Sequence, residues 1–283
     1  MSGAVTARLP DGRLHLQYGP IDLVIGVDGD ASAVTSASDA MVERFATVLD
    51  ELVAELSPLR SDVRLAPQVE GLVAGRMVER AGRLCDGEFA TAMIAVAGAV
   101  ADTIADVGWA AAPLRRLHVN NGGDIALRQS STSSTVIGVV DDVVSGVLAG
   151  RLHVAGDSGI GGVATSGWGG RSLSLGIADA VTVLAADATT ADVVATLVAN
   201  AVDLPGHPSV VRRPAAELRD DTDLGMRPVT VGVGELSVDA VAHALDAGEV
   251  RAREALVHPE VRAVVLCLRG QRRLVGPLPP LTT

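Results

Sequence analysis

The sequence predicts a single domain of mixed α and β structure (α+β, or α/β) over residues 1–283. Helical and strand patterns alternate along the whole chain, and no proline- or serine-rich linker and no run of charges divides them. Hydrophobic residues make up 48% of the chain, enough to bury a large core without a disulfide or a structural metal. These observations favour one core over two separate domains.

Local patterns predict the elements of the amino-terminal half. Residues 13–27 hold two apolar runs around a Tyr-Gly-Pro turn, which predicts a β-hairpin. From Ser38 or Asp39, either of which could cap a helix, apolar residues recur at steps of three and four until Ser57-Pro58 ends the pattern. Two more helices are predicted over 69–84 and 91–106, the second of them buried.

The carboxy-terminal half mixes strand and helix signals. Strands are predicted within 117–140 and 161–176, and at 180–185, 229–233 and 263–268. Helices are predicted at 190–201 and 237–247. The proline-rich tail from about residue 274 is expected to be irregular.

Charge and composition exclude several classes of function. The net charge is -11, and all 23 basic residues are arginine. Without a lysine there is no Schiff base, no P-loop lysine and no lysine general base. The acidic balance and the 2% aromatic content argue against nucleic acid as a partner, since that needs cationic groups and stacking faces. Metal ions and small molecules remain as partners.

We expect a cytoplasmic protein that does not cross a membrane. The most apolar window, residues 90–101, is closed by Asp102 and Asp106 and is too short to span a bilayer. The opening residues carry charge and no apolar segment, unlike a secretory signal. Cys85 and Cys267 lack disulfide or metal-ligand spacing. The apolar content makes a homodimer a reasonable expectation.

The first candidate for chemistry is the segment VNNGGDI at 119–125. Consecutive glycines let the backbone adopt positive φ and expose N–H groups, so Asn121, Gly122, Gly123 and Asp124 could cradle a nucleotide or phosphate. An ordinary tight turn between strands is the alternative. His118, on the strand that enters this loop, is expected to be a hydrogen-bonded strand residue rather than a catalytic one.

The second candidate is a glycine-rich loop at 161–170. Thr165, Ser166 and Gly167 supply hydroxyls and a flexible backbone beside Trp168, so the loop could hold a planar ring or a phosphate. The alternative is a mobile loop with a half-buried tryptophan.

The third candidate is a carboxylate and a hydroxyl on one helix. Asp192 and Thr196 are four residues apart and share a helical face, where together they could bind Mg²⁺, a cation that takes few protein ligands. The alternative is helix capping, with Thr190 as the cap and Asp192 stabilised by the helix dipole.

Taken in order, VNNGGDI, ATSG, VTVLA and TADVVAT resemble the ApbE family of magnesium-dependent FAD:protein FMN transferases, over about residues 92–202. The chain is most similar to an uncharacterised cytoplasmic branch of that family, which shares LHLQYGPIDLVI, AVAGAVAD, TSGWGGRSLSLGIADAVTVLA and a segment like that at 221–225. The resemblance implies an ApbE-like domain with mixed or antiparallel sheets packed against helices.

The resemblance also implies roles for residues. Asp192 and Thr196 would bind Mg²⁺ beside the FAD pyrophosphate, and the 121–124 and 165–167 segments would lie along the flavin nucleotide. The chain departs from the family in the segment at 97–102, where Ala97 and Ala99 replace a lysine and a tyrosine. It also has no histidine between Trp168 and Asp179, where the transferases have one.

Two functions therefore stay open. One is a Mg²⁺-dependent enzyme, of the FMN or pyrophosphate transferase kind, with an incomplete catalytic set. The other is a protein that binds a flavin or another small metabolite without chemistry. A third alternative is that the segments preserve only a fold whose ligand has changed.

Overall fold

The computed structural model describes residues 3–146 and 148–282. The chain forms two compact units, and each is assembled from separate stretches of sequence. The first unit comprises Met1–Thr135, Val154–Ala164 and Ala185–Val193. The second unit comprises Val136–His153, Thr165–Leu184 and Val194–Thr283.

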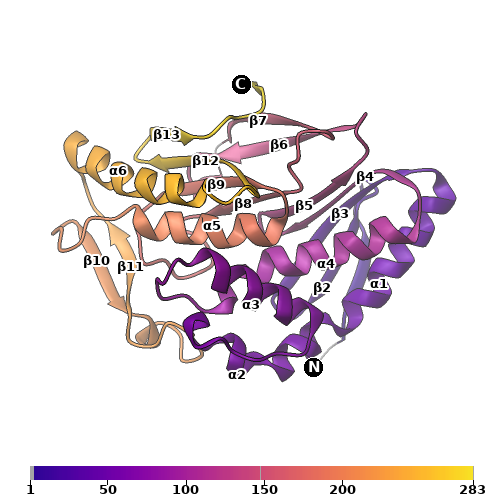
Figure 1. Ribbon diagram of the computed structural model, residues 1–283, viewed down its shortest axis with the longest axis horizontal. Helices are drawn as coiled ribbons and strands as arrows, with labels where there is room; N and C mark the ends of the chain where they lie inside the picture. The colour runs from indigo at the N-terminus through magenta and orange to yellow at the C-terminus, as the bar shows by residue number, and fades with distance from the viewer. Residues whose placement is uncertain (1–2, 147, 283) are drawn as a thin grey trace. The chain divides into compact units, whose positions relative to one another are not determined.

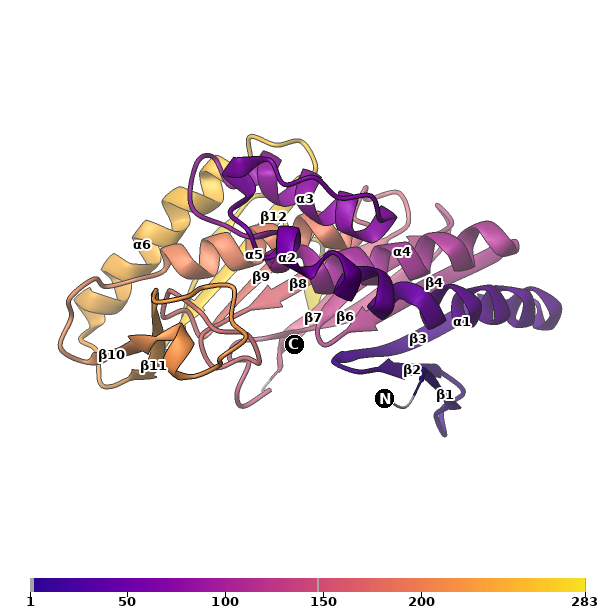
Figure 2. The same cartoon turned by 90° about the horizontal axis from the view of Figure 1, so that it is seen from below.

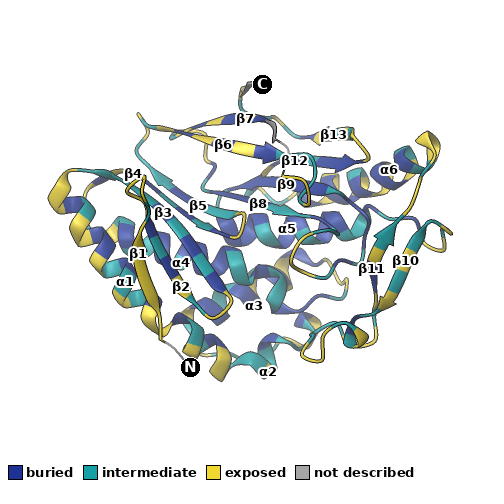
Figure 3. Ribbon diagram, turned by 180° about the vertical axis from the view of Figure 1, so that it is seen from behind, coloured by how far each residue is buried: buried dark blue, intermediate teal, exposed yellow. Residues whose placement is uncertain are grey.

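The sheet of the first unit is an antiparallel meander (Figure 1). Its strands are β1 (Val5–Arg8), β2 (Leu14–Tyr18), β3 (Ile21–Gly29), β4 (Leu114–Asn121) and β5 (Asp124–Gln129), in that spatial order. Strand β8 (Gly162–Ser166) pairs with β5 through Val163 and Ile125. The predicted hairpin is confirmed as β2 and β3. Strand β1 was not predicted, because it has only four residues and all of them are exposed (Figure 3).

Helix α1 (Ala31–Ala54) covers the sheet of the first unit (Figure 2). Its buried positions follow a helical repeat, namely Ala33, Ala37, Met41, Phe45, Val48 and Leu52. The predicted start at Ser38 is wrong by about two turns. Ser38 lies inside the helix and its hydroxyl donates to the Val34 carbonyl, so it bonds to its own helix rather than capping it.

The remaining helices of the first unit follow α1. They are α2 (Leu56–Leu59), the 3-10 turns η1 (Val63–Leu65) and η2 (Ala92–Ala95), α3 (Leu72–Leu84) and α4 (Val96–Ala111). Helix α3 begins three residues later than predicted because Gly71 stands at its cap in an extended conformation. Residues Ala92–Ala111 are long and apolar enough to cross a membrane, and most of them are buried inside the protein, as in a core helix.

The second unit holds the remaining strands and one long helix. In one sheet β9 (Ala180–Ala185), β12 (Val261–Leu268) and β13 (Gln271–Val275) are successive neighbours. Helix α6 (Val238–Ala255) packs on β12 and β13. Strands β10 (Val210–Pro214) and β11 (Pro228–Val233) form a hairpin-like pair, joined through η3 (Ala215–Glu217). Strands β14 (Leu281–Thr282), β7 (Leu148–Ala155) and β6 (Ser134–Val140) form the last sheet.

Two boundaries in the second unit differ from the prediction. The tail is not wholly irregular, because β13 continues to Val275 and β14 pairs with β7. Helix α6 runs eight residues past its predicted end at 247, since Ala252 and Ala255 continue its buried face. The predicted fold class is correct: the protein is α+β, with antiparallel sheets packed with helices.

Candidate functional site

Three segments of the first unit meet around Asp192. This residue lies near the start of α5 (Ala188–Ala201), whose first turn belongs to the first unit. The backbone N–H of Gly98, in the first turn of α4, donates to Asp192 Oδ2 at 2.9 Å. The side-chain amide of Asn121, at the end of β4, donates to the carbonyl of Ala97 at 3.2 Å. The structure therefore brings Asn121 of the first candidate and Asp192 of the third to the same end of α4.

Glycine at position 98 is required by the approach of α5. A Cβ atom built there would lie 2.3 Å from the Ala188 carbonyl oxygen and 2.8 Å from Thr189 Cα. These are backbone atoms, which cannot rotate away as a side chain can. The small residue therefore permits the contact between the amino-terminal ends of α4 and α5.

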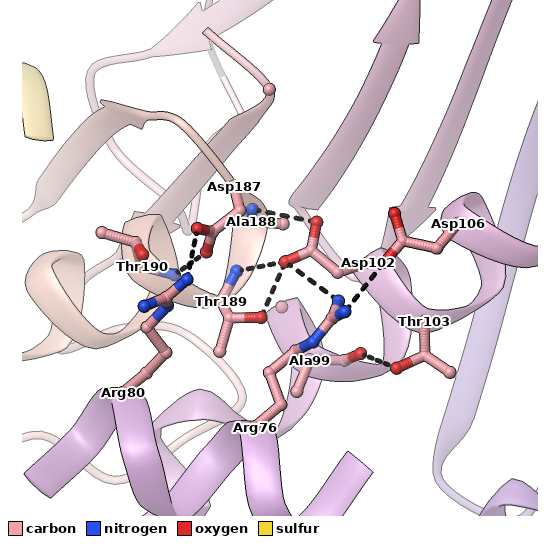
Figure 4. Close-up of polar contacts among 12 residues, drawn as sticks. Arg76, Arg80, Ala99, Asp102, Thr103, Asp106, Asp187, Ala188, Thr189 and Thr190 are labelled. Atoms are coloured by element: carbon pink, nitrogen blue, oxygen red, sulfur yellow. Dashed lines mark hydrogen bonds and ion pairs between the residues drawn. The ribbon is translucent and has the colours of Figure 1, made fainter. Parts of the chain in front are cut away.

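Asp102, one turn further along α4, binds the first turn of α5 (Figure 4). Its carboxylate accepts the N–H groups of Ala188 at 3.2 Å and Thr189 at 2.8 Å, and the Thr189 hydroxyl at 2.7 Å. Asp102 is fully buried. Asp187 Oδ1 accepts the Thr190 N–H at 2.7 Å. The alternative that named Thr190 as the cap is therefore wrong in its residue, because Asp187 and Asp102 fill that role.

Arginines balance these acidic side chains (Figure 4). Arg128 of β5 reaches Asp102 at 3.1 Å and Asp106 at 2.6 Å. Arg76 of α3 reaches the same two carboxylates, at 3.8 and 2.8 Å. Burial raises the pKa of Asp102, while the charge of Arg128 and the Thr189 hydrogen bonds oppose that rise. The two arginines compensate the buried charge of Asp102, which would be strongly unfavourable without ion-pair partners.

Asp192 has a different electrostatic environment. Its pKa is raised well above the ordinary value, first by burial and then by the charge of Asp124, while the Gly98 N–H lowers it. Within residues 3–146 and 148–282, no arginine forms an ion pair with Asp192. A half-buried carboxylate whose charged neighbours are other carboxylates is suited to a bound cation.

The double glycine forms the turn between β4 and β5. Gly122 and Gly123 have φ values of 67° and 117°, and Asn121 pairs with Asp124 across the turn. The Gly123 N–H is used by the side chain of Asn120, at 2.9 Å. The turn is thus a hairpin connection, as the alternative held, and it also carries the Asp124 charge that acts on Asp192. The role of Asn120 was missed, although asparagine before a glycine turn is a known signal.

Residues 165–170 of the second candidate loop lie in the second unit, whereas residues 161–164 belong to the first. The Thr165 hydroxyl is 2.9 Å from that of Thr182 on β9. Gly167 is buried, and a Cβ there would lie 2.5 Å from the Asp179 carbonyl. The indole N–H of Trp168 donates to Asp179 Oδ1 at 3.2 Å. These internal contacts account for the threonine, the glycine and the tryptophan of the loop without a ligand. A flavin contact through Thr165, Ser166 and Gly167 stays a prediction.

Thr196 and His118 complete the predicted set. Thr196 is half-buried on α5 in the second unit. In the described part of the chain, no group of three His, Cys, Asp or Glu side chains could hold a metal, so a cation here would need hydroxyl or ligand oxygens as well. His118 lies on β4 opposite Gly26 of β3, and burial lowers its pKa.

Comparison with known proteins gives a consistent result. The family described as AbpE bacteria matches residues 6–274. A UPF0280 protein from Methanopyrus kandleri is 34% identical over 208 residues, 71% of this chain and 78% of that protein. A UPF0280 protein from Methanothermobacter thermautotrophicus is 38% identical over 117 residues, and this match spans only 44% of that protein.

One solved structure agrees in fold, and a second match is more distant. The ApbE protein from Thermotoga maritima has a TM-score of 0.50 and 12% identity, over 92% of this chain and 96% of that one. The flavin transferase ApbE from Vibrio cholerae has a TM-score of 0.46 and 13% identity over 96% of each chain. The resemblance to an ApbE-like family is confirmed at the level of family and fold.

Proposed function

Because this chain belongs to the bacterial AbpE family, we propose that it binds a flavin nucleotide with Mg²⁺ and transfers or cleaves at the pyrophosphate. One observation carries the proposal: Asp192 has the charge of Asp124 as a neighbour and lacks an arginine partner among the described residues. The ligand class follows from the resemblance of this chain to the ApbE-type transferases, which the family match and the fold of the Thermotoga maritima ApbE protein support.

The residues present fit a divalent cation. Asp192 would supply a carboxylate and Thr196 a hydroxyl, both from α5, and Asp124 adds a second acidic group near Asp192. A bound Mg²⁺ would supply Lewis-acid polarisation of the pyrophosphate. The protein's own contribution is to hold Asp192 in place through the Gly98 N–H and to keep its carboxylate away from competing arginines.

Binding without chemistry is the second candidate. Ala97 and Ala99 stand where the transferases have lysine and tyrosine, and no histidine lies between Trp168 and Asp179. An enzyme without these three side chains would rely on the cation alone to polarise the pyrophosphate. This absence favours a flavin-binding protein over a transferase.

A single experiment separates the two candidates. Purified protein is titrated with FAD with and without Mg²⁺, and AMP release is followed by chromatography. Mg²⁺-dependent AMP that disappears in Asp192→Ala supports the enzyme, and tight FAD binding without AMP supports the binding protein. Asp39→Ala, an exposed carboxylate on α1, is the matched control and should behave as wild type. Absence of FAD binding under both conditions overturns both candidates.

A further inference from the structure

The first turn of α5 is held by a single buried side chain of another helix. Asp102 accepts three hydrogen bonds from Ala188 and Thr189. Asp192 lies four residues after Ala188, one helical turn along the same face. Any shift or rotation of the Ala188–Thr189 turn therefore moves the Asp192 carboxylate with it.

Asp102 is itself fixed from two sides. Arg128 of β5 and Arg76 of α3 both approach its carboxylate, at 3.1 and 3.8 Å. Of the three bonds that Asp102 receives from α5, two come from backbone N–H groups and only one from a side chain, the Thr189 hydroxyl. Thr189 is fully buried and keeps no water contact of its own. Its hydroxyl is the part of this connection that a substitution can remove without changing a charge.

We propose that Thr189, acting through Asp102, is a positioning residue that sets the affinity of the Asp192 site for its divalent cation. This inference rests on the proposed function, because it concerns the cation at that same site. Thr189 orients the turn that carries Asp192 and does not touch the cation. Removing a group that orients a metal ligand typically weakens metal binding about 10- to 100-fold, and Thr189 acts one step further away.

Thr103 provides a matched control (Figure 4). It lies on α4 directly after Asp102, and its hydroxyl donates to the Ala99 carbonyl of its own helix at 2.7 Å. Thr103→Val thus removes a comparable hydroxyl from the same neighbourhood without a bond to α5. Thr189→Ser keeps the hydroxyl and tests rescue by the conservative variant.

The experiment measures Mn²⁺ binding by electron paramagnetic resonance in protein saturated with FAD, and FAD affinity separately in EDTA. We expect Thr189→Val to raise the Kd for Mn²⁺ about three- to tenfold. Thr189→Ser and Thr103→Val should stay within about twofold of wild type, and FAD affinity in EDTA should be unchanged in all of them. Thr189→Ala, compared with Thr103→Ala, replaces the valine variants if Thr189→Val does not fold.

The outcomes separate the two proposals. If wild type binds Mn²⁺ and loses it in Asp192→Ala, while Thr189→Val behaves like Thr103→Val, the positioning inference is overturned and the proposed function stands. Equal losses of Mn²⁺ and FAD binding in Thr189→Val indicate general damage to the fold and also overturn the inference. A wild-type protein that binds no Mn²⁺ overturns both.

Discussion

Asp102 and Asp192 make reciprocal hydrogen bonds across the contact between α4 and α5. The Asp102 carboxylate, on α4, accepts N–H groups in the first turn of α5, and the Asp192 carboxylate, on α5, accepts an N–H in the first turn of α4. The N–H groups at each helix start thus find an acceptor in a carboxyl group of the other helix. The two carboxylates differ in one respect, since arginines compensate Asp102 and none pairs with Asp192 among the described residues.

Asp192→Asn should stabilise the metal-free protein at neutral pH, by on the order of 1 kcal/mol. Burial and Asp124 raise the pKa of Asp192 in the folded state, so the folded protein holds a proton that the unfolded chain has released. Stability is then lost as the pH rises from about 4 towards the folded pKa. The asparagine keeps an oxygen for the Gly98 N–H and removes the charge. Urea unfolding at several pH values measures the difference.

In the presence of Mg²⁺, Asp192→Asn should instead be less stable than wild type. The cation stabilises wild type by binding the folded state and has no effect on the variant. The pH-dependent part of the difference should vanish below about pH 3, where the aspartate of the unfolded chain is largely protonated. A variant that is less stable than wild type at every pH without metal would show that Asp192 acts only as a cap for α4.

Local sequence patterns predicted many of the elements but not the contacts that join them. Strand β9 was predicted with its observed bounds, because a run of apolar residues ending before Ala-Asp is a local signal. The cap of α5 was misassigned to Thr190, since its main partner, Asp102, lies 86 or 87 residues earlier in the chain. The resemblance drew attention to residues 97–102 through Ala97 and Ala99, and only the structure shows that Gly98 and Asp102 in this segment join α4 to α5.

Gly98→Ala should destabilise the protein by about 1–3 kcal/mol or more, because its methyl group would overlap the Ala188 carbonyl and force α5 away from α4. Gly75→Ala is the control. Gly75 also lies in a helix, α3, but nothing is within 4 Å of a Cβ there, so alanine should be neutral or stabilise by up to about 1 kcal/mol. Thermal and urea unfolding of both variants test the contrast, and equal effects would contradict it.

The Cys267 thiol should be unreactive in the folded protein. Burial and a hydrogen bond to Asp141 raise its pKa to about 12, so almost no thiolate exists at pH 8. Reaction with Ellman's reagent in a Cys85→Ser background should therefore require denaturant. Asp141→Asn removes the carboxylate and leaves Arg272 nearby, which should lower the pKa and speed the reaction. Fast labelling of the folded Cys85→Ser protein would contradict this prediction.

Gly26→Ala should cost about 1–3 kcal/mol through a collision with His118, and removing the His118 ring should relieve part of that cost. The two residues are directly opposite on β3 and β4, and a Cβ at position 26 would lie 2.1 Å from His118 Cε1. A double-mutant cycle of Gly26→Ala and His118→Ala should give a coupling energy of about 1 kcal/mol or more, because the double variant has no ring to collide with. Burial also lowers the pKa of His118, so the unfolded chain takes up a proton first as the pH falls below about 6.5, and stability is lost there. His118→Ala should remove that loss. Additive free energies in the cycle would mean that the ring rotates away freely, in which case glycine at position 26 serves some purpose other than making room for it.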